Sequence, residues 1–118
     1  MATSFCSSRG TASLDEHGND VHVGDLRGQM RRTLKNITGL LASEDATWHG
    51  IVRTTCCLRD IDRDDEAFND ERTAFFKENG LDSLPASTGI QARLCRPELL
   101  VEIEAMFYSE KQTTLNRK

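Results

Sequence analysis

The sequence predicts an α+β fold in which one mixed β-sheet carries two helices packed on one of its faces. Three observations support this fold class. Over residues 101–108, Val, Ile, Ala and Phe alternate with Glu, Glu, Met and Tyr, which is the period of a half-buried strand. Apolar residues recur every three or four positions over 26–41, and residues 51–58 form a dense β-branched run. Strands and helices in this order favour a two-layer α+β sandwich.

Length and composition restrict the function classes. A chain of 118 residues is expected to form one domain, and its net charge of -4 argues against a general affinity for nucleic-acid backbones. No apolar run approaches the ~20 residues that span a bilayer, so no membrane association is expected. The first residues lack the apolar segment of a secretory signal, and we therefore expect a cytoplasmic protein.

The first half of the chain is expected to contain a strand, a turn and a helix. Residues 2–13 indicate one irregular strand, and residues 15–20 are rich in turn formers. Val21–Val23 is predicted to be a short strand or an extended lead-in to a helix that is capped by Asp25 and ends near Ser43. Basic residues lie mostly off the apolar stripe of this helix, which favours a solvated face over a nucleic-acid patch.

The middle of the chain is expected to add a strand and a second helix. Trp48 is predicted to fill the space between helix and sheet, just before the strand 51–58. Residues 60–64 are expected to turn the chain. Acidic residues suit the first turn of a helix beginning at Asp64, and Asn79-Gly80 is a typical helix end.

The last two strands are predicted to form a hairpin around a break at residues 96–98. Residues 86–95 and 101–108 both alternate, so we expect one core face and one face carrying polar side chains. The alternation assigns Val101, Ile103, Ala105 and Phe107 to the core, and Glu102 and Glu104 to the polar face. It places Ser87 and Gly89 on the same side of the neighbouring strand as Glu102. An ordinary half-buried hairpin with a solvated polar face is the alternative interpretation.

The cysteine and histidine pattern predicts no metal site and no cofactor. Cys6, Cys56, Cys57 and Cys95 show no Cys-x-x-Cys spacing, and the three histidines are scattered. Adjacent Cys56 and Cys57 would point to opposite faces of a strand and are expected to be core or near-core thiols. Free thiols are the state expected of a cytoplasmic protein.

The stretch from Pro85 to Tyr108 resembles the signature of the RidA (YjgF) family. Pro-Ala-Ser-Thr, an Arg-Leu step and Leu-Val-Glu-Ile-Glu-Ala carry the resemblance. It implies the RidA fold, akin to AroH-type chorismate mutase, and a homotrimer with ligand clefts between subunits. Residues 1–112 would form this domain without the family's first strand, which would lie upstream of residue 1, and 113–118 would be a tail.

The same resemblance implies a set of ligand-binding residues. Gly10 matches a strand glycine beside the ligand, Asn69 a cleft asparagine and Glu102 a cleft glutamate. An arginine that holds the substrate carboxylate in the family's imine deaminases is replaced here by Ser87, and Gly89 stands where a small or thiol side chain is common. The resemblance therefore implies a small-carboxylate binder that is not a working imine deaminase. A plain surface position on a helix is the alternative for Asn69.

A narrower resemblance is to the C-terminal half of chorismatases. Cys95-Arg96-Pro97-Glu98-Leu99-Leu100-Val101-Glu102 carries it, together with Gly-Thr-Ala-Ser and Val-His-Val-Gly-Asp. It implies that Glu102 donates a proton to an enolpyruvyl group, that Cys95 lies at the product-determining position and that Arg93 helps to hold a carboxylate. Three classes thus stay open: a metabolite-binding RidA-type protein, a chorismatase-like enzyme or domain, and a ribonuclease or translation inhibitor. The acidic charge balance disfavours the third.

Overall fold

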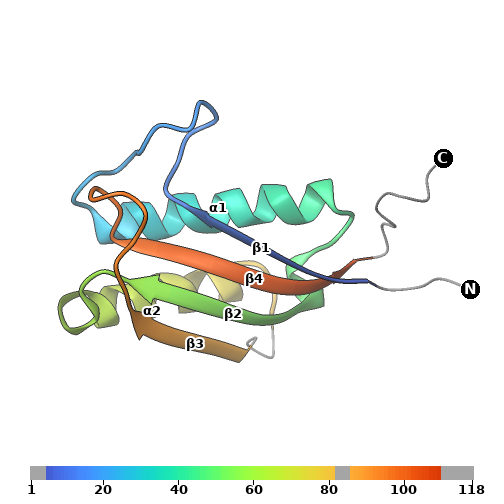
Figure 1. The fold of residues 1–118 in the computed structure, drawn as a ribbon. Coiled ribbons are helices and arrows are strands. Elements are labelled where there is room, and N and C mark those ends of the chain that lie inside the picture. The colour runs from blue at the N-terminus through green and yellow to red at the C-terminus, as the bar shows by residue number, and fades with distance from the viewer. Residues whose placement is uncertain (1–4, 82–85, 110–118) are drawn as a thin grey trace, which may run out of the picture.

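The structure, a computed structural model, describes residues 5–81 and 86–109 and contains one sheet and two long helices (Figure 1). The expected tail at 113–118, the first three residues of the expected strand at 2–13, and Pro85 lie outside the described residues. The helices and strands follow one another in this order: β1 (Phe5–Ala12), α1 (Leu26–Ser43), a 3-10 turn (Trp48–Gly50), β2 (Ile51–Leu58), α2 (Ile61–Glu78), β3 (Ala86–Gln91) and β4 (Val101–Ser109).

The sheet is mixed, with the strand order β1-β4-β2-β3. β4 pairs antiparallel with both β1 and β2, whereas β3 pairs parallel with β2 after the α2 crossover. Both helices lie behind the sheet in Figure 1, so the predicted fold class, one mixed sheet covered by two helices, is confirmed.

The predicted hairpin between the last two strands is wrong. β3 and β4 lie on opposite sides of β2, and the first of the two expected strands ends at Gln91 rather than at residue 95. Alternation assigns the faces of a strand but does not identify its partner. A nine-residue connection, 92–100, is long enough to carry the chain past the end of β2.

The main core lies between the sheet and the helices. β4 alternates as predicted, because Val101, Ile103, Ala105 and Phe107 are buried while the residues between them are half-buried or exposed. The helices contribute buried apolar side chains to the same cluster: Leu26, Met30, Leu34, Ile37, Leu41, Phe68 and Phe76. Trp48 is buried beside the Phe75 and Phe76 rings and donates from Nε1 to Thr38 Oγ1 at 2.8 Å, which confirms its predicted place.

Two helix and strand bounds differ from the sequence prediction. Val21–Val23 forms no strand; an isolated bridge joins Leu14 to Asp20 instead, and His22 has φ 59°, a left-handed conformation that an extended strand excludes. Helix α2 begins at Ile61 rather than Asp64, because the Asp60 side chain accepts from Arg63 N and caps the helix earlier. Asp25 caps α1 as predicted.

Neither helix in the described parts of the chain is long and apolar enough to cross a membrane.

A fully buried amide fixes the connection between β3 and β4. Gln29 of α1 donates from Nε2 to Glu98 O at 2.9 Å and to His22 O at 3.2 Å, and its Oε1 accepts from Leu100 N at 2.7 Å. Arg59 adds hydrogen bonds from its guanidinium to Leu99 O and Arg96 O. The connection is therefore held at defined backbone atoms immediately before β4.

We predict that Gln29→Met lowers the free energy of unfolding by about 1–3 kcal/mol, because it leaves buried backbone groups without partners. Urea denaturation measures this loss. Lys35→Met, at an exposed position of the same helix, is the matched control and is expected to change stability by no more than about 0.5 kcal/mol. Equal stability of the two variants would contradict the proposed role of the amide.

Candidate functional site

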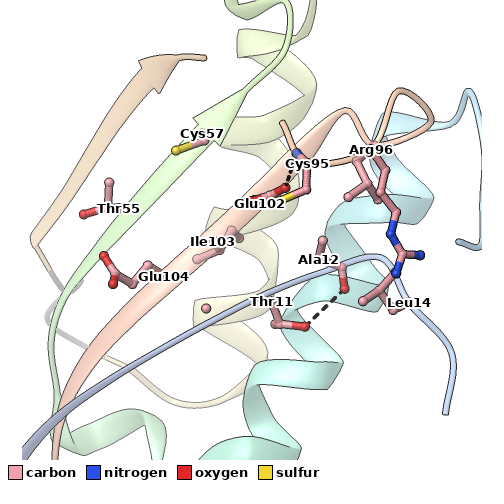
Figure 2. Close-up of a pocket in the computed structure, with 12 residues that line it drawn as sticks. Thr11, Ala12, Leu14, Thr55, Cys57, Cys95, Arg96, Glu102, Ile103 and Glu104 are labelled. Atoms are coloured by element: carbon pink, nitrogen blue, oxygen red, sulfur yellow. Dashed lines mark hydrogen bonds between the residues drawn. The ribbon is translucent and has the colours of Figure 1, made fainter. Parts of the chain in front are cut away.

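A pocket of about 350 Å³ lies on the sheet face that the helices leave uncovered (Figure 2). It is placed there by β1, β2, β4 and the 92–100 connection. The lining residues are Gly10, Thr11, Ala12, Leu14, Thr55, Cys57, Cys95, Arg96, Leu99, Glu102, Ile103 and Glu104. An apolar cluster of Ala12, Leu94 and Leu99, with Cys57 packed against it, lies on the same face and gives the pocket a hydrophobic wall.

Two carboxylates of β4 provide the acidic chemistry of this pocket. Glu102 is half-buried, and its Oε2 accepts a hydrogen bond from Cys95 N at 3.1 Å, as the dashed line in Figure 2 shows. Glu104 is exposed and accepts from Ser8 Oγ at 2.8 Å. Among the described residues neither carboxylate forms an ion pair, and Oε1 of Glu102 has no hydrogen-bond partner. Glu102 thus has an oxygen available to a ligand in the pocket.

The two neighbouring cysteines of β2 face different environments, as the sequence predicted. Cys56 is buried on the helix side, whereas Cys57 is half-buried in the pocket wall. Burial raises the pKa of the Cys57 thiol above its usual value, and the negative charges of Glu102 and Glu104 raise it further. Cys57 is therefore a protonated thiol at neutral pH, which makes it a pocket wall rather than a nucleophile.

Arg96 brings a positive charge to the rim of the pocket. Its Nη1 donates to Asp20 Oδ1 at 2.8 Å and to Gly18 O at 2.9 Å, so the side chain ties the 92–100 connection to the loop after β1. With Glu102 and Glu104 nearby and Asp20 paired to Arg96, the charge balance of the pocket remains negative.

Gly10 leaves space in the pocket. A Cβ atom at this position would make ordinary contacts of 3.7 Å with Ile103 O and 3.9 Å with Glu104, so the strand pairing itself does not require a glycine. The missing side chain instead keeps open the part of the pocket beside Glu104.

The structure brings together only part of the predicted site. Gly10, Cys95 and Glu102 line one pocket. Arg93 is exposed, does not line the pocket and makes no ion pair within the described residues.

The predicted position of Ser87 and Gly89 beside Glu102 is wrong. Ser87 Oγ accepts from Thr54 Oγ1 at 3.1 Å and lies 3.8 Å from Cys56 Sγ, both on the helix side of β2. Gly89 is paired with Cys56 and follows the same side of β3. The error follows from the incorrect hairpin: β3 pairs with β2 in a register that turns its odd-numbered residues toward the helices.

Asn69 belongs to a separate group at the outer edge of β3. Its Oδ1 accepts from Nη2 of Arg72 at 2.7 Å, while Nη1 of the same arginine donates to Ser87 Oγ at 3.1 Å. Arg72 also lies over the Phe68 ring, with its guanidinium carbon 5.1 Å from the ring centroid. We call Asn69, Arg72 and Ser87 the edge cluster.

Sequence reasoning missed Arg72 and the pocket residues Thr55, Cys57 and Arg96. The alternation in β2 placed Thr55 and Cys57 on one face, but without the strand order nothing related that face to Glu102. Arg72 gave a spacing signal, since it lies one helical turn after Asn69. Within the described ranges, no group of three His, Cys, Asp or Glu side chains is arranged to hold a metal ion.

Comparisons with known proteins agree with the fold. A RutC family protein of Pyrococcus abyssi is 26% identical over 106 residues, covering 90% of this chain and 80% of that protein. The crystal structure of the YjgF gene product of E. coli superposes with a TM-score of 0.75 at 23% identity, over 88% of this chain and 79% of that chain. The crystal structure of E. coli TdcF with bound serine superposes with a TM-score of 0.76 at 20% identity, over 86% of this chain and 79% of that chain.

The family model described as endoribonuclease L-PSP matches residues 2–108. This match extends from before the first strand to Tyr108, one residue before the end of β4, and includes every residue of the pocket and of the edge cluster. The chain therefore belongs to the endoribonuclease L-PSP family, also called the RidA or YjgF family.

Proposed function

We propose that this protein binds a small carboxylate metabolite at the pocket on its uncovered sheet face. The observation that carries the proposal is Glu102, a half-buried carboxylate with an unused oxygen beside an apolar wall, which can accept a hydrogen bond from a hydroxyl or amino group of such a ligand. A pocket of about 350 Å³ suits a small molecule. The serine bound in E. coli TdcF is an amino acid, which is a ligand of this size and chemistry on a similar fold.

The ligand cleft is proposed to be completed by further copies of the chain in a homotrimer. Ile90 and Tyr108 are 44% and 53% exposed, and their strand registers place both on the uncovered face. Met106 is half-buried and Cys95 exposed on this face, whereas Leu100 packs on the main core. Apolar residues gathered on an open sheet face are typical of a surface that another subunit covers.

Imine hydrolysis is not part of the proposal. Ser87 is neutral and cannot make the bidentate, charge-assisted contact that an arginine makes with a carboxylate. A ribonuclease is disfavoured as well, because the net charge of -4 and a pocket lining without a basic, aromatic surface do not suit a nucleic-acid backbone.

A chorismatase-like reaction is the second candidate, and the position of Glu102 favours it. The open pocket beside Gly10 has room for a ring-shaped carboxylate, and Glu102, which lines this pocket, would be the proton donor to an enolpyruvyl group. In this reaction Cys95, whose backbone N–H donates to Glu102, would lie beside the substrate in the wall of the same pocket.

We predict that light scattering will give three times the mass of one chain at micromolar concentration. Ile90→Asp should shift the protein toward monomers, because it places a charge on the proposed interface. Val23→Asp is the matched control: Val23 is 61% exposed in the loop before α1, and the variant should remain a trimer. A monomeric wild-type protein would contradict the proposed assembly.

We predict that hydrolysis of 2-iminobutanoate stays near the uncatalysed rate. The strand supplies no cation at Ser87, and loss of a charge-assisted contact alone weakens binding by about 1.5–3 kcal/mol, roughly ten- to a hundredfold. Ammonia release measures this activity. Turnover well above background would show that the chain is an imine deaminase despite Ser87.

If the protein acts on chorismate, Glu102→Gln should abolish pyruvate release while preserving the assembly, because glutamine keeps the size of the side chain but cannot donate a carboxyl proton. Glu104→Gln, the neighbouring exposed carboxylate on the same face, is the matched control. A coupled lactate dehydrogenase assay measures pyruvate. Absence of pyruvate release by the wild type would remove this candidate and leave the binding function to be tested by thermal shift.

A further inference from the structure

We propose that Arg72 of helix α2 binds the carboxylate group of the ligand from the neighbouring helix, a position from which it does not replace the strand arginine of the imine deaminases. This inference rests on the proposed function and deepens it by naming the residue that recognises the acid. It assigns the carboxylate to the edge cluster of Asn69, Arg72 and Ser87 rather than to the acidic pocket.

The Arg72 guanidinium lies beside Ser87 at the edge of β3. Arg72 Nη1 lies 3.1 Å from Ser87 Oγ, so its guanidinium occupies the space into which a longer side chain at position 87 would project. The guanidinium therefore reaches the outer edge of β3 from a neighbouring helix instead of from the strand itself. β3 pairs only with β2 within the described residues, and its other edge is free to receive a ligand.

The Arg72 side chain is held in one orientation by its neighbours. Phe68 lies beneath the guanidinium at 5.1 Å, and Asn69 Oδ1 and Ser87 Oγ accept from its two terminal nitrogens. Stacking and hydrogen bonding fix the orientation of a long side chain, which lowers the entropy lost when a ligand binds. Asn69 itself is oriented by a hydrogen bond from its Nδ2 to Asp65 Oδ1 at 3.2 Å.

The charge of Arg72 distinguishes it from other arginines of the two helices. Other arginines of the two helices pair with acids: Arg27 and Arg31 with Glu71, and Arg63 with Asp64. Arg72 has no acidic partner among the described residues. A guanidinium has five N–H donors, and only two of them are used by Asn69 and Ser87. The remaining donors and the unbalanced charge match a planar carboxylate.

Strand geometry adds a consequence for the assembly. Ser87 is opposite Thr54 and Glu102 is opposite Cys57, on different faces of β2. Ser87 and Glu102 are three residues apart along the strand direction and two strands apart across the sheet. Each of these separations is roughly 10 Å. A small ligand that contacts both Arg72 and Glu102 therefore needs them from two copies of the chain, since one copy presents them on opposite faces of the sheet.

Isothermal titration calorimetry with 3-hydroxybenzoate and its neutral analogue 3-hydroxybenzamide tests the role of Arg72. We expect Arg72→Gln to weaken binding of the benzoate about ten- to a hundredfold while leaving the weaker binding of the benzamide unchanged. Lys77→Gln, which removes one charge from an exposed position of the same helix, is the matched control and should change neither affinity. Titrating the wild type and both variants with 2-oxobutanoate extends the test to an aliphatic acid.

A second experiment moves the guanidinium from position 72 to position 87. The double variant Arg72→Gln, Ser87→Arg places a guanidinium at the same edge from the strand and should recover much of the lost benzoate affinity. Equal benzoate affinity of wild type and Arg72→Gln would overturn the inference and leave the proposed function standing. Equal losses for benzoate and benzamide would also overturn it, because Arg72 would then act only on the structure. If the wild type binds no carboxylate probe, the proposed function itself fails.

Discussion

The central constraint in this molecule is the strict alternation of strand β4, which pairs with strands on both sides. Its odd-numbered residues from Val101 to Phe107 are buried against two helices, so its even-numbered residues must face the other way. A one-residue slip would bury Glu102 and Glu104 and expose the core, which fixes the register. The core and the acidic pocket are thus two faces of the same strand.

The uncovered face has a local order of its own that does not come from the main core. The 92–100 connection folds back over the end of the sheet and is held by the Gln29 amide and the Arg59 guanidinium. This places Cys95 N against Glu102 and Leu99 beside Ala12. A buried amide on α1 therefore positions a wall of the pocket on the opposite side of the sheet, which links helix packing to the site.

Charge is divided between two places in the chain. The pocket collects carboxylates, whereas the edge cluster holds an arginine without an acidic partner among the described residues. A ligand that carries an acid at one end and a group to be protonated or hydrogen-bonded at the other would therefore contact both places only between two copies of the chain. The neutral Ser87 then has a positive role, because its small side chain admits the Arg72 guanidinium and accepts a hydrogen bond from it.

The sequence by itself determined the fold class, the family resemblance, both helices, the strand Ile51–Leu58 and the two faces of β4, because these depend on local periodicity and capping. It also singled out Glu102, Gly10 and Cys95, which share the pocket. Only the tertiary structure decided that β3 pairs with β2 rather than β4, because period-two alternation is the same for any partner. That pairing moved Ser87 to the helix side and brought it to Arg72, a contact between residues on different elements that no spacing along the chain specifies.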